Sequence, residues 1–199
     1  MSPQIHRNKA VNSCMTVHGL FLLGAATALI LAISGCGAKS FDAIRSGLET
    51  QGHYIEGVPF VMQTEYDCGP AALASVLSFR GKAIDLERIT ASVYLPKLRG
   101  TLPMDLERYA RDEGFSTSSS AGTTATLKTA VKSNIPVICL LDLGFWFYRQ
   151  PHFVTVIGFD DGNGVFIMHD GGTPNRTMGY EDFAKKWARA GTWMIAIEP

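Results

Sequence analysis

The feature that most constrains this chain is an uncharged N-terminal stretch, because these residues are not expected to belong to the folded domain. No charged residue stands between Lys9 and Lys39, and residues 19–33 are apolar or small throughout. Arg7 and Lys9 precede this run, which is the charge order of a secretory signal. A membrane-spanning helix needs about 20 apolar residues, so this shorter run favours a cleaved export signal over a permanent span.

The apolar run ends in a short motif at Cys36. The segment Leu31-Ala-Ile-Ser-Gly-Cys36 resembles the lipobox of bacterial lipoproteins, in which the Cys is acylated and becomes the first residue after cleavage. The resemblance implies a signal peptide over residues 1–35, a lipidated Cys36 with a tether over residues 36–57, and a folded domain over residues 58–199.

Alternatively, the N-terminal segment remains as an uncleaved anchor helix, and Cys36 has no role in it. Both hypotheses predict that the rest of the chain is exported and that the membrane is a partner. We therefore expect the domain to face the periplasm or the cell exterior, held there by its lipid. Gly37, in place of an Asp, resembles the sorting pattern of the outer membrane if the cell is Gram-negative.

Length and charge narrow the remaining classes of protein. The chain has 199 residues, which is room for about one domain, and 18 Lys+Arg balance 18 Asp+Glu. Nucleic-acid binding needs a clustered positive surface to displace the counterions of the phosphates. The balanced charge and the lack of a basic run therefore argue against a nucleic-acid partner.

Beyond the tether, the apolar pattern changes from helical spacing to alternation. A short helix is expected around residues 41–48, inside the tether. The expected domain helices cover residues 68–79, 85–93, 103–114, 123–133 and 180–190, and the expected strands cover residues 136–141, 152–160, 164–169 and 192–197. Helices followed by antiparallel strands predict an α+β domain, with the N-terminal helices packed on a C-terminal antiparallel sheet.

The cysteines of the chain separate by their surroundings. Cys14 lies in the signal and Cys36 is the candidate lipid site, whereas Cys139 stands in an apolar run that predicts a buried strand. Cys68 follows Asp67, a candidate N-cap, and opens a helix whose unpaired N–H groups favour a thiolate. An unpaired thiol in an oxidising compartment needs a reason, so Cys68 is the candidate nucleophile.

A thiol nucleophile needs a base, and the exported part of the chain offers His53, His152 and His169. The segments 152–160 and 164–169 are separated by turn residues and predict a hairpin. If paired residue numbers in this hairpin have an even sum, Asp170 lies beside His152 on one face and His169 points the other way. An odd sum would separate His152 from Asp170, so the register decides whether they can act together.

Two segments of the chain carry a resemblance to a known family. Gln63-Thr-Glu-Tyr-Asp-Cys-Gly-Pro-Ala-Ala-Leu73, followed by His152-Phe-Val-Thr-Val-Ile-Gly-Phe-Asp160, resembles the C39-like cysteine peptidases, which are papain-superfamily domains. The resemblance covers residues 57–199. The segments Val93-Tyr-Leu-Pro96 and Gly100-Thr-Leu102 are also similar to a subgroup of stand-alone bacterial members with lipoprotein signals.

The resemblance implies a papain-like cysteine peptidase fold and a set of catalytic roles. Cys68 would be the nucleophile, His152 the general base, Asp170 its orienting acid, and Gln63 a donor to the oxyanion. It implies a peptide or protein substrate and no cofactor. Asp170 is followed by Gly171 where the family usually has an Asp-Pro pair, and the chain contains no P-loop, so the double-glycine leader substrate of transporter-fused members does not carry over.

The same residues leave other functions open. An acyl-enzyme does not specify its acceptor, so the triad could also serve an acyl or peptidyl transferase. A member of the family could instead be catalytically inactive and act as a binding or assembly lipoprotein. That alternative predicts an unreactive Cys68 thiol with an ordinary or raised pKa.

Two further segments are ambiguous by sequence. The run Gly144-Phe-Trp-Phe-Tyr-Arg-Gln-Pro151 could line a substrate cleft, touch lipid or pack beneath the sheet. The oxygen-rich run 160–164 lacks the spacing of a calcium loop and predicts a plain turn. We expect no metal site, because alternating strand faces separate His152 from His169.

Overall fold

The computed structural model describes residues 39–199, so the expected signal peptide over residues 1–35 and the lipid site at Cys36 lie outside the described part. The helices are α2 (Phe41–Ile44), a 3₁₀ turn (Arg45–Gly47), α3 (Leu48–Gln51), α4 (Cys68–Phe79), α5 (Leu86–Val93), α6 (Pro103–Asp112), α7 (Thr124–Lys132) and α8 (Tyr180–Arg189). The strands are β1 (Gly52–Tyr54), β2 (Ser116–Ala121), β3 (Val137–Asp142), β4 (Pro151–Asp160), β5 (Val165–His169), β6 (Arg176–Gly179) and β7 (Trp193–Glu198).

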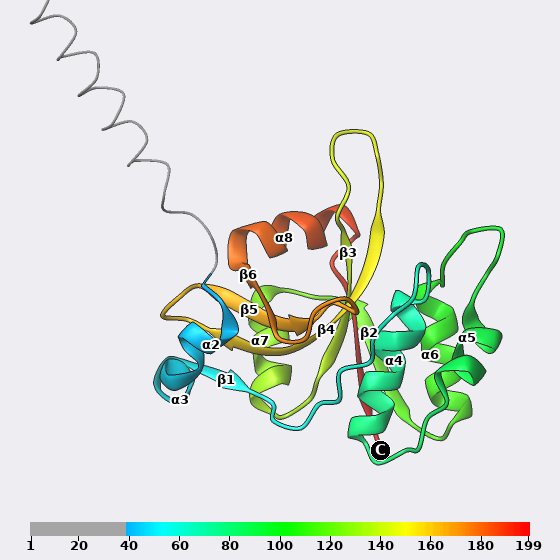
Figure 1. Cartoon of the computed structure of the whole chain (residues 1–199), viewed down its shortest axis with the longest axis horizontal. Helices are drawn as coiled ribbons and strands as arrows, with labels where there is room; N and C mark the ends of the chain where they lie inside the picture. The colour runs from blue at the N-terminus through cyan, green and yellow to red at the C-terminus, as the bar shows by residue number, and fades with distance from the viewer. Residues whose placement is uncertain (1–38) are drawn as a thin grey trace, which may run out of the picture. The chain divides into compact units, whose positions relative to one another are not determined.

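The strands form one seven-stranded sheet in which every pairing is antiparallel. Its order is β2-β7-β3-β4-β5-β6, and β1 pairs with the far end of β4. Strand β4 therefore lies at the centre, with β3 and β1 along one edge and β5 along the other (Figure 1). The prediction of an α+β domain with helices packed on an antiparallel sheet is confirmed.

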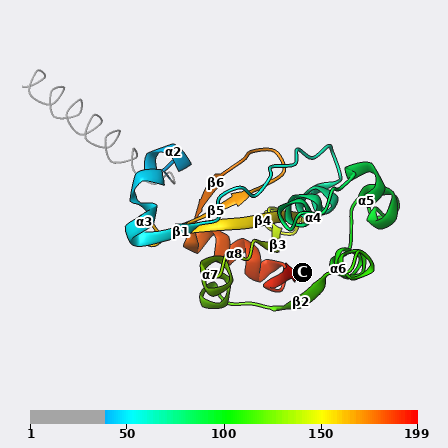
Figure 2. The ribbon, with the colours of Figure 1, turned by 90° about the horizontal axis from the view of Figure 1, so that it is seen from below.

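Two apolar cores cover the sheet, and at β3 they lie on opposite faces. Val137, Cys139 and their neighbours pack with Leu127 of α7 and Trp187 of α8, two helices that share one side of the sheet in Figure 2. Ile138 and its neighbours pack on the other face with α4, α5 and α6. The alternation of β3 between the two cores follows from the two-residue period of a strand.

Three short strands, β1, β2 and β6, are not predicted from the sequence because they lack an apolar alternation. Strand β2 has the sequence STSSSA and pairs only with β7, at an edge of the sheet. Strand β6 has four residues at the opposite edge, and β1 has three. Their positions are set by backbone pairing to longer strands rather than by side-chain burial, so their sequences carry little signal.

The folded unit begins earlier than the expected boundary at Val58. Phe41, Ile44 and Leu48 on α2 and α3 are buried in the core that also contains Ile55. Strand β1 then pairs with β4. The tether expected over residues 36–57 therefore includes a segment that packs on the domain, because its apolar residues are spaced to meet the sheet.

Among residues 39–199, none of the helices combines the length and the apolar character that crossing a membrane requires.

The burial of α2 generates a prediction about stability. Ile44 is only 2% exposed, so Ile44→Ala should lower the free energy of unfolding by about 2–5 kcal/mol through lost burial and a cavity. Ser46→Ala, on an exposed position of the next turn, should change it by less than about 0.5 kcal/mol. Urea unfolding of both variants measures this, and equal stabilities would show that the segment is only a tether.

Candidate active site

Cys68 occupies the first position of helix α4, as its sequence predicts. The main-chain oxygen of Asp67 accepts from the amide of Ala71 at 2.9 Å, which starts the helix. The Asp67 carboxylate does not cap α4 as expected; it accepts from the amide of Thr64 at 2.5 Å instead. The carboxylate thus fixes the loop leading into α4, and the amides of the first turn are left near the Cys68 sulfur.

The position of His152 relative to Asp170 depends on a β-bulge in β4. Near the turn, Asp160 pairs with Val165 and Gly158 with Ile167, which gives an odd sum of residue numbers. The register shifts between Val156 and Gly158, and Thr155 then pairs with His169, which gives an even sum. One extra residue in β4 therefore restores the parity that puts His152 and Asp170 side by side.

His152 meets the main chain of Asp170 rather than its carboxylate. The ring Nε2 of His152 lies 2.8 Å from the Asp170 carbonyl oxygen. A carbonyl can only accept, so Nε2 carries the proton in the neutral ring and Nδ1 presents its lone pair. The structure thus holds His152 in the tautomer that a base needs, with Nδ1 as the accepting nitrogen.

The Asp170 carboxylate is engaged elsewhere. One oxygen accepts from the amides of Gly172 at 3.0 Å and Thr173 at 2.6 Å, and the other pairs with Arg176 at 2.6 Å. Burial raises the pKa of this carboxyl, but Arg176 and these amides outweigh it, so the pKa is lowered. The carboxylate shapes the loop after β5, and it is the loop's carbonyl that contacts His152.

Gln63 is held against the same loop. Its main-chain N–H donates to the Gly171 carbonyl oxygen at 2.9 Å. Its side-chain oxygen is buried without a hydrogen-bond partner among the described residues. A methyl group on Gly171 would overlap that side-chain oxygen, and Gly171 has a φ of 78°. A glycine is therefore required at position 171, both for its backbone conformation and for the close approach of Gln63.

One cleft of about 740 Å³ brings Gln63, Cys68, His152 and Asp170 together. The amide of Phe153, the residue after His152, is among the groups that act on the Cys68 sulfur, which places this sulfur beside the start of β4. One wall is the loop of residues 98–103 and another is the β3–β4 hairpin. The arrangement places a thiol, an imidazole and a side-chain amide along one cleft.

Burial dominates the electrostatics of the thiol and the imidazole. It raises the pKa of the Cys68 thiol above its ordinary value, although the amides of Phe153 and Gly69 lower it. Burial also lowers the pKa of His152, against the opposing effects of the Asp170 carbonyl and carboxylate. Both shifts favour an uncharged thiol and an uncharged ring at rest. The thiolate expected from the helix N-terminus is thus disfavoured by desolvation.

The other histidines and the second cysteine lie away from the cleft. His169 is buried, with Nε2 donating to the Val58 carbonyl at 3.1 Å and Nδ1 accepting from the Asn175 amide at 3.2 Å. His53 contacts the side chain of Asn134 at 3.0 Å. Cys139 is unpaired and buried in the core on the opposite face of the sheet from α4. Over residues 39–199, no three His, Cys, Asp or Glu side chains are grouped as metal ligands.

Sequence reasoning missed Arg176 and the loop wall of the cleft. Arg176 neutralises Asp170 and lines the cleft, yet it opens the short edge strand β6, whose four residues show no apolar alternation that would predict the contact. The wall formed by residues 98–103 follows α5, and only the final packing of α5 and α6 on the sheet brings it to Cys68.

The comparisons with known proteins agree on one family. Residues 55–194 match the model of the Peptidase_C39 like family. The fold resembles the peptidase domain of Streptococcus ComA, a bifunctional ABC transporter of a quorum-sensing pathway, with 26% identity, a TM-score of 0.60, and coverage of 71% of this chain and 98% of that one. No curated protein matches the chain significantly.

Two further solved structures support the fold alone. A Bacillus anthracis protein described as a C39-like peptidase has 16% identity and a TM-score of 0.62, covering 75% of this chain and 98% of that one. A double-glycine-motif protease from an AMS/PCAT transporter, solved with its leader peptide, has 22% identity and a TM-score of 0.60, covering 74% and 94%.

The raised pKa of the Cys68 thiol predicts its reactivity. The thiolate is the alkylated species, so iodoacetamide should label Cys68 slowly at neutral pH, and the rate should climb only as the pH passes above 9. Mass spectrometry separates this label from Cys139, which is fully buried and should stay unlabelled in the folded protein. Rapid labelling of Cys68 at pH 6–7 that is lost in His152→Ala would show a thiolate–imidazolium pair instead.

Proposed function

Since the chain belongs to the peptidase C39-like family and has its fold, we propose that it is a cysteine peptidase in which Cys68 is the nucleophile and His152 the base. The observation that carries the proposal is the shared cleft: it is lined by Cys68 at a helix N-terminus, by His152 with Nδ1 as the accepting nitrogen, and by Gln63. The raised pKa of the Cys68 thiol is also what an inactive binding protein predicts, but binding alone does not need a thiol, an imidazole and Gln63 in one cleft.

The proposed reaction begins from an uncharged pair. As the Cys68 sulfur attacks the substrate carbonyl carbon, its proton moves to His152 Nδ1, and the carbonyl oxygen becomes an oxyanion. The Gln63 side-chain amide and main-chain N–H groups at the start of α4 donate to that oxygen. His152 then gives the proton to the leaving amine, and water releases the acyl group from Cys68.

A peptide or protein is the proposed substrate. The related transporter protease was solved with a leader peptide, and the cleft of this chain is large enough for several side chains of an extended segment. The acceptor of the acyl group is water in this proposal. Transfer to an amine would use the same residues, so analysis of the products distinguishes a hydrolase from a transferase.

We also propose that the domain is exported and held at a membrane. The support is the sequence alone: the apolar run of residues 19–33, the preceding cations and the lipobox-like segment ending at Cys36. Acyl chains on Cys36 would tether the domain to the periplasmic or outer face of that membrane, at the outer membrane in a Gram-negative cell.

The catalytic proposal is tested by matched histidine variants. With the full chain in detergent and a peptide library, new termini identified by mass spectrometry should disappear in Cys68→Ala and fall by at least about 10³-fold in His152→Ala. His53→Ala should cleave normally, because the His53 ring bonds the Asn134 side chain and does not line the cleft. Cleavage that survives in Cys68→Ala would show that this cleft is not the site of a cysteine peptidase.

The contact of His152 with a main-chain carbonyl predicts that the Asp170 side chain is partly dispensable. Asp170→Asn keeps an oxygen for the amides of Gly172 and Thr173 and loses only the ionic pairing with Arg176. We expect kcat/KM to fall by less than about tenfold, whereas loss of a carboxylate that orients the histidine costs about 10⁴-fold. Steady-state kinetics decide between them, and a fall of the larger size would make the carboxylate the orienting group.

A further inference from the structure

The β3–β4 hairpin carries four consecutive aromatic side chains, Phe145 to Tyr148, which we call the aromatic tip. Their exposed fractions are 72%, 91%, 91% and 57% in chain order. The connection projects from the body of the fold in Figure 1. Packing beneath the sheet, one of the alternatives left open by the sequence, is therefore excluded.

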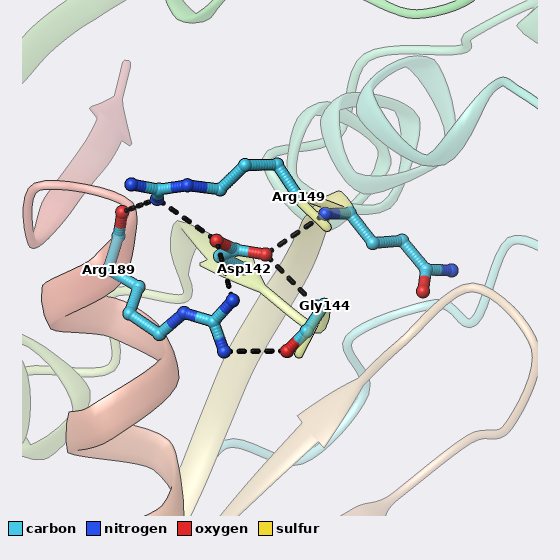
Figure 3. A network of polar contacts seen from close by, with 5 residues as sticks. Asp142, Gly144, Arg149 and Arg189 are labelled. Atoms are coloured by element: carbon cyan, nitrogen blue, oxygen red, sulfur yellow. Dashed lines mark hydrogen bonds and ion pairs between the residues drawn. The ribbon is translucent and has the colours of Figure 1, made fainter. Parts of the chain in front are cut away.

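The base of the aromatic tip is fixed by a buried carboxylate. Asp142 accepts from the amides of Gly144 and Gln150, each at 3.0 Å. It also pairs with Arg149 at 3.0 Å and Arg189 at 3.3 Å, as Figure 3 shows. Arg189 donates to the Gly144 carbonyl at 2.6 Å, so the end of α8 is tied to the hairpin.

The backbone of the aromatic tip also has a defined conformation. Trp146 has a φ of 50°, a left-handed conformation that is unfavourable for a bulky residue. Tyr148 donates its amide to the Phe145 carbonyl at 2.9 Å, which closes the turn. A methyl group on Gly144 would overlap the Tyr148 carbonyl oxygen, so the chain needs glycine there. The tip is therefore a built feature that holds its aromatic rings in water at a cost in free energy.

We propose that the aromatic tip inserts into the interface of a lipid bilayer. Of its four residues, only Tyr148 lines the cleft. A peptide substrate is bound in a concave cleft. Phe145, Trp146 and Phe147 instead stand on a projection that nothing in the described chain covers. A bilayer can surround a projection on all sides, and its interface is where Trp and Tyr side chains concentrate in membrane proteins.

The charges near the tip suit an anionic membrane surface. Arg149 follows the tip directly and keeps most of its side chain exposed. On the other wall of the cleft, the exposed Leu98 stands between Lys97 and Arg99. Arg99 lies 3.7 Å from Glu65, which offsets its charge, but Lys97 and the two arginines around Asp142 leave a positive balance. Cations beside inserted apolar groups attract anionic headgroups.

The sequence that precedes the described residues also favours a lipid bilayer as the partner of the tip. The apolar run of residues 19–33 precedes Cys36, and the folded unit begins within a few residues of it. A lipid-bearing Cys36 would hold the domain next to a bilayer, where a weakly binding tip is effective because its local concentration is high. The hairpin also contributes Leu143 and Tyr148 to the cleft, so insertion of the tip would present the cleft to substrates at the membrane surface.

The chain contains a natural reporter of insertion. Among its three tryptophans, Trp146 is the exposed one; Trp187 is buried and donates to the Trp193 carbonyl, and Trp193 donates to Ser119. The full chain is reconstituted in vesicles of phosphatidylethanolamine and phosphatidylglycerol whose acyl chains are brominated. Contact with these chains should quench the Trp146 emission. Trp146→Ser should remove most of the quenching, because Trp187 is buried and Trp193 is half-buried with its ring N–H bound to Ser119.

Variants separate the tip from the tether. Flotation and intact mass first show whether the full chain is membrane-bound and acylated at Cys36, which tests the proposed anchor alone. The isolated domain of residues 39–199, which contains both apolar cores, should still bind these vesicles. Trp146→Ser/Phe147→Ser should weaken its partitioning at least about tenfold. Met104→Ser, which removes an exposed apolar side chain from α6 rather than from the tip, should leave it unchanged.

Three results would overturn the proposal. The first is a full chain that floats with the vesicles while Trp146 stays unquenched. The second is a Trp146 emission that changes with a peptide substrate in the absence of lipid, which would make the tip a substrate surface. The third is self-association of the domain that the double variant abolishes, with no binding to vesicles, which would make the tip a contact between two copies.

Discussion

The antiparallel pairing of β4 is the constraint on which the rest of the structure depends. Its two edges are shared among β1, β3 and β5, and its first residues carry His152 and the amide that faces Cys68. The bulge between Val156 and Gly158 converts an odd register at the turn into an even one at His152. His152 thus reaches the loop after β5 because of one inserted residue.

Burial explains both the stability of the fold and the chemistry of the cleft. Helix α4 is covered almost completely by the sheet and by α5 and α6, so the thiol at its first residue is partly removed from water although it lines the cleft. That desolvation outweighs the helix amides and leaves the Cys68–His152 pair uncharged. The same packing keeps Cys139 in the core of the other face, where it cannot pair with Cys68.

The sequence predicted what depends on local signals and missed what depends on packing at a distance. Cys68 at the start of a helix and His152 on a strand follow from apolar runs, their spacing and the turn residues between them, and so does the α+β class. The register beside His152 remained open, because the apolar run of β4 is buried on both faces and shows no alternation. The polar β2, the burial of Ile44 and the replacement of the Asp170 carboxylate by its carbonyl all require tertiary partners that no local pattern encodes.

The hairpin of β3 and β4 links the tip to the candidate site through one buried charge. Asp142 pairs in register with Pro151, the residue before His152, and burial of its carboxyl is offset by two amides and two arginines, so its pKa is lowered. An apolar residue would avoid the desolvation of this carboxylate. It could not, however, fix Gly144, Gln150 and α8 at once, because only an acceptor with several lone pairs meets all of these donors. The network of Figure 3 therefore sets the direction of the aromatic tip and the start of the strand that carries His152.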